Sequence, residues 1–146
     1  MKNERKIIND KLWNYAKRID ELNTEIQMCN LLINDLANPL KATSYDKEPG
    51  KGENNSTVES AVLLRERYCQ SIAKSTQEKE KVMREFEAYI SPTNITQRAI
   101  LRDRYINRCN NRKLCYNHNY SEDHIKRLIA EAQDILYNTY KNTAQL

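Results

Sequence analysis

Cysteine and histidine are the residues of this chain best suited to metal or nucleophile chemistry, and they gather near its end. Cys109, Cys115 and His118 form a C-x5-C-x2-H cluster, and His124 follows shortly afterwards. This spacing matches no ligand pattern typical of zinc sites. Cys115 also falls on the expected buried face of a short helix, where cysteine behaves as a small hydrophobic residue. We therefore expect no metal and no other cofactor.

Catalytic groups are equally scarce in the sequence. Only two histidines occur, and no serine or cysteine beside them forms the pattern of a nucleophile with its general base. The carboxylates are spread over expected helix exteriors, as surface ion pairs require. These features argue against an enzyme and favour a binding protein.

Positive charge is concentrated in the last third of the chain. Residues 1–91 hold 15 Lys+Arg and 15 Asp+Glu, whereas residues 92–146 hold 9 basic and 5 acidic residues, so the net charge of +4 lies there. A neutral region joined to a basic end favours a polyanion as the partner of that end. Exposed Lys and Arg are also ordinary on solvated helices, so charge alone does not identify the partner.

The composition predicts an all-α fold. Gly occurs twice and Pro three times, which leaves little material for hairpin turns or glycine-rich phosphate loops. No apolar run approaches the roughly 18 residues of a membrane span, and the N-terminus lacks the apolar stretch of a signal peptide. We expect a cytoplasmic protein with reduced cysteines.

The first helix is expected over about residues 4–37. Its apolar residues repeat at alternating spacings of four and three, the pattern of a helix packed along its length against another helix. This seam consists of Ile8, Leu12, Tyr15, Ile19, Leu22, Ile26, Cys29, Ile33 and Leu36.

A second long helix is predicted from a capping box at Ser56–Glu59 to about Ile90, before Pro92. The proline- and glycine-containing residues 38–55 are expected to form a loop. Residues 1–91 would then be a long, coiled-coil-like helical hairpin that acts as a dimerisation arm. The apolar stripe expected on the second helix consists of Val58, Val62, Cys69, Ile72, Met83, Phe86 and Ile90.

The second stripe is a poor match for the first seam, because polar Arg65, Thr76 and Lys79 interrupt it. Part of the first seam would stay uncovered in a single hairpin, so we predict a homodimer. A monomeric bundle that covers the seam internally is the alternative. The residues assigned to dimerisation are Leu12, Tyr15, Ile19, Leu22, Ile26, Cys29 and Ile33.

Residues 92–146 are predicted to form a separate domain of three short helices, at about 95–107, 111–117 and 122–140. Asn94, with Gln97 three residues later, can cap the first of them. Asn119 can adopt the left-handed conformation in the turn between the second and third, and Ser121 is placed to cap the third. Two short helices joined in this way have the length and turn of a helix-turn-helix.

The segments Gln97–Ile106, Tyr120–Ser121 and Ile125–Ala132 resemble region 4 of sigma-70-type factors, over about residues 95–137 without gaps. More closely, the chain resembles the sigma-70 region-4-like helix-turn-helix regulators encoded by phages and prophages of Gram-positive bacteria (the ArpU/RinA-like group). The resemblance implies a transcriptional regulator that binds double-stranded DNA in the host cell. Host RNA polymerase or another host protein is a further partner to test. The family often has Gly where Arg108 and Asn119 stand.

The last helix is expected to enter the major groove, with Ile125, Leu128, Ile129 and Ala132 facing the core. Lys126 and Arg127 would donate to guanine, and His124 to a base edge or phosphate. The start of the preceding helix would grip phosphate, with Arg102 and Arg104 as secondary contacts. The predicted DNA-binding residues are Asn111, Arg112, Lys113, Ser121, Asp123, His124, Lys126 and Arg127.

Two other functions remain open from sequence. A protein-interaction adaptor, or an inhibitor of a host complex with a degenerate helix-turn-helix, would fit the acidic Glu122 and Asp123 and the polar helix before them. A DNA-packaging component is a weaker third interpretation, since small terminase subunits combine the same parts in the reverse order.

Overall fold

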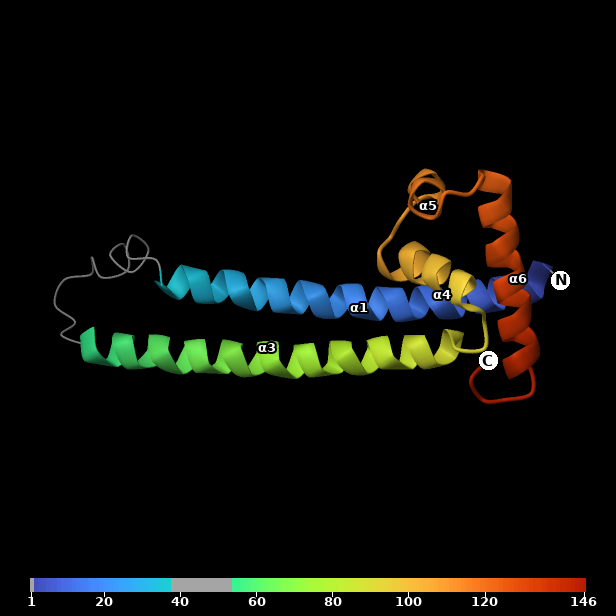
Figure 1. The fold of residues 1–146 in the computed structure, drawn as a ribbon. Helices are drawn as coiled ribbons and strands as arrows, with labels where there is room; N and C mark the ends of the chain where they lie inside the picture. The colour runs from blue at the N-terminus through green and yellow to red at the C-terminus, as the bar shows by residue number, and fades with distance from the viewer. Residues whose placement is uncertain (1, 38–53) are drawn as a thin grey trace. The chain divides into compact units, whose positions relative to one another are not determined.

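The computed structural model describes residues 2–37 and 54–146, and this part of the chain forms helices without any strand. The predicted all-α class is confirmed. The expected loop at 38–55 lies outside the described residues except for its last two, which already belong to a helix. The helices are α1 (Lys2–Ala37), α3 (Asn54–Ile90), α4 (Ile95–Leu101), the π-helix η1 (Arg102–Ile106), α5 (Asn111–His118) and α6 (Glu122–Tyr140), shown in Figure 1.

The helices divide between two compact units. One comprises Met1–Ile19 with Lys81–Leu146, and the other comprises Asp20–Glu80. The structure therefore divides elsewhere than the predicted boundary at residue 91. The first turns of α1 and the last turns of α3 belong with the C-terminal helices because they share a core with them. We call the first of these the head unit and the second the arm unit.

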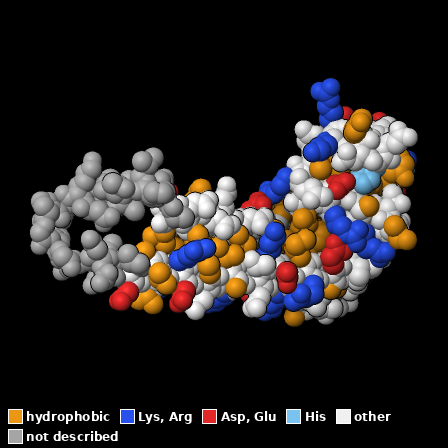
Figure 2. Space-filling model, turned by 60° about the vertical axis from the view of Figure 1, so that its left-hand side comes forward, with side chains coloured by type: hydrophobic (Ala, Val, Ile, Leu, Met, Phe, Trp, Pro, Cys, Tyr) orange, Lys and Arg blue, Asp and Glu red, His pale blue; other side chains and the backbone are white. Residues whose placement is uncertain are grey.

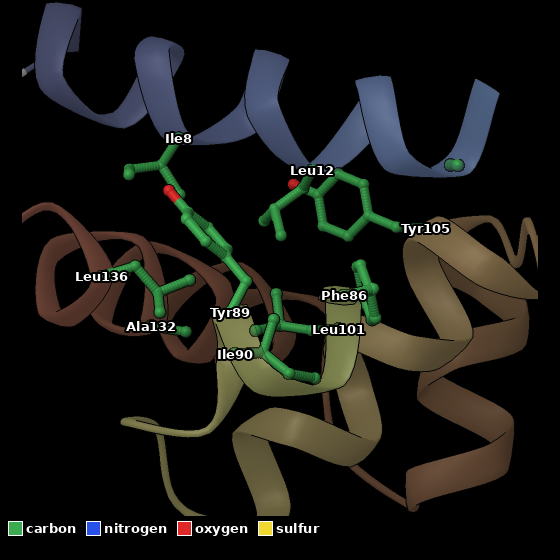
Figure 3. Close-up of a cluster of buried hydrophobic side chains, with 10 residues drawn as sticks. Ile8, Leu12, Phe86, Tyr89, Ile90, Leu101, Tyr105, Ala132 and Leu136 are labelled. Atoms are coloured by element: carbon green, nitrogen blue, oxygen red, sulfur yellow. The ribbon is translucent and has the colours of Figure 1, made fainter. Parts of the chain in front are cut away.

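The main core of the head unit joins α1, α3 and α6 to the α4–η1 segment. Figure 3 shows side chains from all of them converging on one another. Burying such side chains contributes roughly 1.5–3 kcal/mol each relative to exposure, so this cluster fixes α6 to both long helices. Its buried members are Ile8, Leu12, Ala16, Phe86, Tyr89, Ile90, Leu101, Tyr105, Ala132 and Leu136.

A buried polar contact crosses this core at Tyr105. The phenol donates to Asn9 Oδ1 at 2.6 Å and accepts from Gln133 Nε2 at 3.2 Å. Burial raises the pKa of Tyr105, so the hydroxyl keeps the proton that it donates. The ring also lies edge-on to Trp13, with the centroids 4.7 Å apart. The contacts link α1, η1 and α6 in one register, since a buried hydroxyl is stable only when its partners are in place.

An ion pair at the edge of the head unit joins α1 to α6. Arg5 Nε and Nη2 donate to the two carboxylate oxygens of Asp134, each at 2.9 Å. These hydrogen bonds lower the pKa of Asp134 below its ordinary value of 3.8. Such two-pronged contact gives the pair a fixed geometry.

This lowered pKa predicts a loss of stability in acid. Asp134 stabilises the fold fully above its unfolded pKa near 4 and loses that contribution as pH falls through its lower folded pKa. We expect Asp134→Asn to unfold more readily than the wild type at pH 7, and the difference to shrink steadily below pH 4. Urea unfolding followed by Trp13 fluorescence at several pH values measures this. A difference that stayed constant with pH would contradict the assignment.

The seam predicted on α1 is its inward face. Ile19 and Leu22 are buried, and Ile26, Cys29 and Ile33 are partly buried. Within the arm unit, Ser75 Oγ donates to Glu25 Oε2 at 3.1 Å, so α1 and α3 lie beside each other there. The heptad pattern thus identified the correct face of the first helix.

The stripe predicted on α3 is wrong in phase. Val62 is 53% exposed, Met83 is 36% exposed and Cys69 is exposed as well. The inward face instead carries the partly buried Leu64 and Tyr68 and, nearer the end of the helix, buried residues that include Val82 and Tyr89. Two adjacent stripes of this helix are apolar, and the inward one holds its larger aromatic side chains. Spacing alone did not distinguish them.

Candidate nucleic-acid interface

The helices α5 and α6 form a helix-turn-helix with the boundaries expected from sequence to within a residue. Asn110 caps α5, its Oδ1 accepting from Lys113 N at 2.9 Å. Asn119 ends this helix in the left-handed conformation, with φ 58° and ψ 43°. Ser121 then caps α6, its Oγ accepting from His124 N at 3.2 Å. Each cap satisfies a backbone group that the helix end would otherwise leave unpaired.

The left-handed turn gives a specific expectation for Asn119. A residue with a Cβ costs roughly 1–2 kcal/mol in this conformation, and Asn and Gly tolerate it best. We expect Asn119→Gly to leave the urea midpoint nearly unchanged and Asn119→Ala to lower stability by about 1 kcal/mol. The same Asn→Ala change at Asn138, exposed within α6, is the matched control and should be neutral. Equal midpoints for all three variants would contradict the role given to the turn.

A second, smaller core holds the two helices against α4. It contains the buried Ile100, Cys109, Leu114 and Ile125, with Cys115, Leu128 and Ile129 partly buried against it. The predicted phase of α6 is therefore correct: one face is buried along its length. The opposite face leaves Lys126 and Arg127 exposed.

The predicted DNA-binding residues lie at the surface of α5 and α6. Arg112, Lys113, Asp123, Lys126 and Arg127 are all exposed. Ser121 is also exposed, although its hydroxyl serves as the cap of α6. Asn111 and His124 are partly buried. The structure thus leaves the proposed cationic residues accessible and gives Ser121 a structural hydrogen bond.

The π-helix η1 holds α5 at both of its ends. Near the start of α5, Arg104 Nη1 donates to Asn111 Oδ1 at 3.0 Å. At its end, His118 Nε2 lies 2.8 Å from Asp103 Oδ2, and the backbone oxygen of Asp103 accepts from Cys109 N at 2.9 Å. The orientation of α5 is therefore fixed by side chains as well as by the small core.

The secondary candidates Arg102 and Arg104 have structural partners. Arg102 Nη2 donates to Glu87 Oε2 at 2.7 Å, and this contact raises the pKa of the guanidinium. Arg104 contacts Asn111 as described above. Arg108, where the related family often has Gly, has a φ of 57° and lies over the Trp13 ring at 4.9 Å. These arginines stabilise the head unit internally.

The charge of the head unit is larger than the sequence division suggested. Residues 1–19 and 81–146 hold 17 Lys+Arg and 9 Asp+Glu, for a net of +8, whereas residues 20–80 hold 7 and 11, for a net of −4. The start of α1 is strongly basic and belongs to the head unit. Figure 2 shows Lys and Arg side chains distributed over the face that also carries a histidine.

Two aromatic residues of the surface were not predicted as contacts. Tyr116 on α5 is 87% exposed and Tyr120, in the turn, is 36% exposed. Tyr116 follows Arg112 by four positions, so both lie on one side of α5. That spacing was visible in the sequence.

The seven residues assigned to dimerisation are covered within a single chain. Leu12, Ile19 and Leu22 are at most 3% exposed, and the remaining four are partly buried. The uncovered part of the seam on which the dimer was argued is absent from the described residues of α1. Self-association stays a prediction, and the apolar side chains available to it in the arm unit are Met28, Leu31, Leu32, Val62 and Leu63.

The described residues contain no group of three His, Cys, Asp or Glu side chains arranged to hold a metal ion. Cys109 is buried in the small core, and His118 contacts Asp103. Among residues 2–37 and 54–146, no helix has the length and apolar character of a membrane span.

Comparison of the chain with models of protein families, with curated proteins and with solved structures finds no match. The likeness to sigma-70 region-4-like regulators therefore stays a prediction, supported by the sequence segments quoted above.

Proposed function

We propose that the head unit binds double-stranded DNA through α5 and α6, and that the protein regulates transcription of phage or prophage genes. The observation that carries the proposal is the division of α6 into two faces. Ile125 and Ala132 are buried completely, while Lys126 and Arg127 between them are exposed. A helix held along one face and cationic on the other is what insertion into a major groove requires.

The two helices would have different tasks on the duplex. Arg112 and Lys113, beside the free amides at the start of α5, would contact phosphates and set the orientation. Lys126 and Arg127 would reach base edges from the first two turns of α6, where arginine pairs best with guanine. The net charge of +8 on the head unit supports such an encounter with a polyanion.

Anisotropy of a labelled duplex across a salt series tests the proposal directly. Each phosphate neutralised contributes about −0.9 to the slope of log K against log salt concentration, so four cations would give a slope of about −3 to −4. Unbiased selection from a random duplex pool should then return a preferred sequence. Absence of binding at low salt, or binding indifferent to salt, would refute the function.

A protein-interaction adaptor is the second candidate, and the exposed Tyr116 favours it. Tyrosine and arginine dominate the energetics of protein interfaces, and α5 presents Tyr116 on the same side as Arg112. A pull-down from nuclease-treated host lysate distinguishes the two functions. An adaptor keeps its partner after nuclease treatment and loses it in Tyr116→Ala, whereas a DNA-binding regulator loses its catch to the nuclease.

A further inference from the structure

Three side chains at the start of α6 contact one another in sequence. The Tyr120 ring meets the His124 ring edge-on, with centroids 4.5 Å apart and an interplanar angle of 76°. On the same imidazole, Nδ1 lies 2.5 Å from Nη2 of Arg127. Tyr120 precedes the helix, and the other two residues are three positions apart on it. The contact therefore runs from the turn to an exposed guanidinium.

The chemistry of this contact fixes the role of each atom. A guanidinium is always charged and only donates hydrogen bonds, so His124 Nδ1 must accept. The imidazole is then neutral and carries its proton on Nε2. One of the five N–H groups of Arg127 is used, which leaves enough donors for the two that bidentate contact with guanine O6 and N7 requires.

Lys126, beside Arg127, is held in a different way. Its Nζ lies 3.2 Å from Glu122 Oε1, and both side chains are more than half exposed. Contact with DNA would replace this ion pair and bring the Glu122 carboxylate towards phosphates. The neutral partner of Arg127 imposes no such repulsion. The two cations of α6 are therefore not equivalent.

We infer that His124 and Tyr120 are positioning residues that order Arg127 for reading a guanine, which makes Arg127 the main specificity-determining residue of α6. This inference rests on the proposed function. It also changes the role expected for His124, from a direct contact with DNA to a support for the side chain that makes one. A side chain ordered before binding loses less conformational freedom when the complex forms.

The experiment begins with the duplex selected by the wild-type protein from a random pool. The base pair read by Arg127 is the one whose preference disappears in Arg127→Ala. Discrimination is then the ratio of affinities for the selected duplex and for the duplex with that pair changed. We expect Arg127→Ala to lower this ratio roughly tenfold or more.

The variants of His124 separate its ring from its acceptor atom. His124→Phe keeps a ring against Tyr120 but has no acceptor, and should lower discrimination several-fold. His124→Asn places Oδ1 where Nδ1 stands and should retain most of the discrimination. Adding His124→Phe to Arg127→Ala should change little, because the first residue acts through the second. Affinity for the altered duplex and the salt slope should stay at wild-type values in both single variants.

Three results would overturn the inference while leaving DNA binding intact. The effects of His124→Phe and Arg127→Ala are additive, or His124→Asn is as defective as His124→Phe, or all duplexes lose affinity equally. The last result would return His124 to a phosphate contact. A wild-type protein that binds no duplex would refute the function and the inference together. Imidazole ¹⁵N spectra of the free protein provide an independent check, since a protonated Nδ1 contradicts the contact.

Discussion

Alanine substitution of Arg112, Lys113, Lys126 and Arg127 together is expected to reduce affinity for the selected duplex by roughly a hundredfold to a thousandfold near physiological salt. Each cation lost removes about 0.9 from the salt slope, and the base contacts of α6 are lost as well. Titrations at several salt concentrations measure both quantities. The salt slope should fall towards zero as the affinity falls.

The same variant should fold like the wild type. All four side chains are exposed, and surface substitutions away from cores and caps change stability by about 0.5 kcal/mol or less. The one ion pair that is removed, Lys126 with Glu122, is solvated and contributes little. An unchanged unfolding curve would therefore assign the loss of binding to the interface and not to the fold.

A matched control removes equal charge from elsewhere. Lys17 on α1 and Arg65, Arg67 and Lys74 on α3 are exposed and lie outside the helix-turn-helix. Replacing these four with alanine lowers the net charge by the same amount, so any effect of overall charge is common to both variants. If the control loses as much affinity as the test variant, binding depends on net charge and the interface is misplaced.

The sequence predicted most of the helix-turn-helix because its determinants are local. The caps at Asn94, Asn110 and Ser121 are short-range hydrogen bonds, and such signals are readable without tertiary information. The left-handed turn at Asn119 follows from the same local chemistry. The phase of α6 followed from a single apolar face, since its other face is almost wholly polar.

The arrangement of the head unit could not be predicted in this way. Arg5 pairs with Asp134 across 129 positions, and Trp13 packs against Tyr105 and Arg108. Contacts of this separation leave no periodic signal. The first residues of α1 were therefore assigned to a neutral arm, although they add basic charge to the head unit. The phase of α3 failed for a related reason, because its two apolar stripes differ only in what packs on them.

Truncation of Leu136 is expected to produce the largest loss of stability in the head unit. The side chain is completely buried in the main core, where α6 meets α1 and α3. Leu→Ala at such a position removes buried methyl groups and leaves a cavity, at a cost of about 2–5 kcal/mol. That is a large part of the roughly 5–15 kcal/mol that stabilises a typical domain.

Trp13 reports on this unfolding because it is the sole tryptophan and contacts Tyr105 in the head unit. Met28→Ala is the control: this side chain is 54% exposed in the arm unit, and its truncation should leave the Trp13 transition unchanged. A Leu136→Ala midpoint equal to that of Met28→Ala would show that the second half of α6 is not anchored. The helix that carries Lys126 and Arg127 would then lack the rigid support that groove insertion requires, because the small core around Ile125 would be its only attachment.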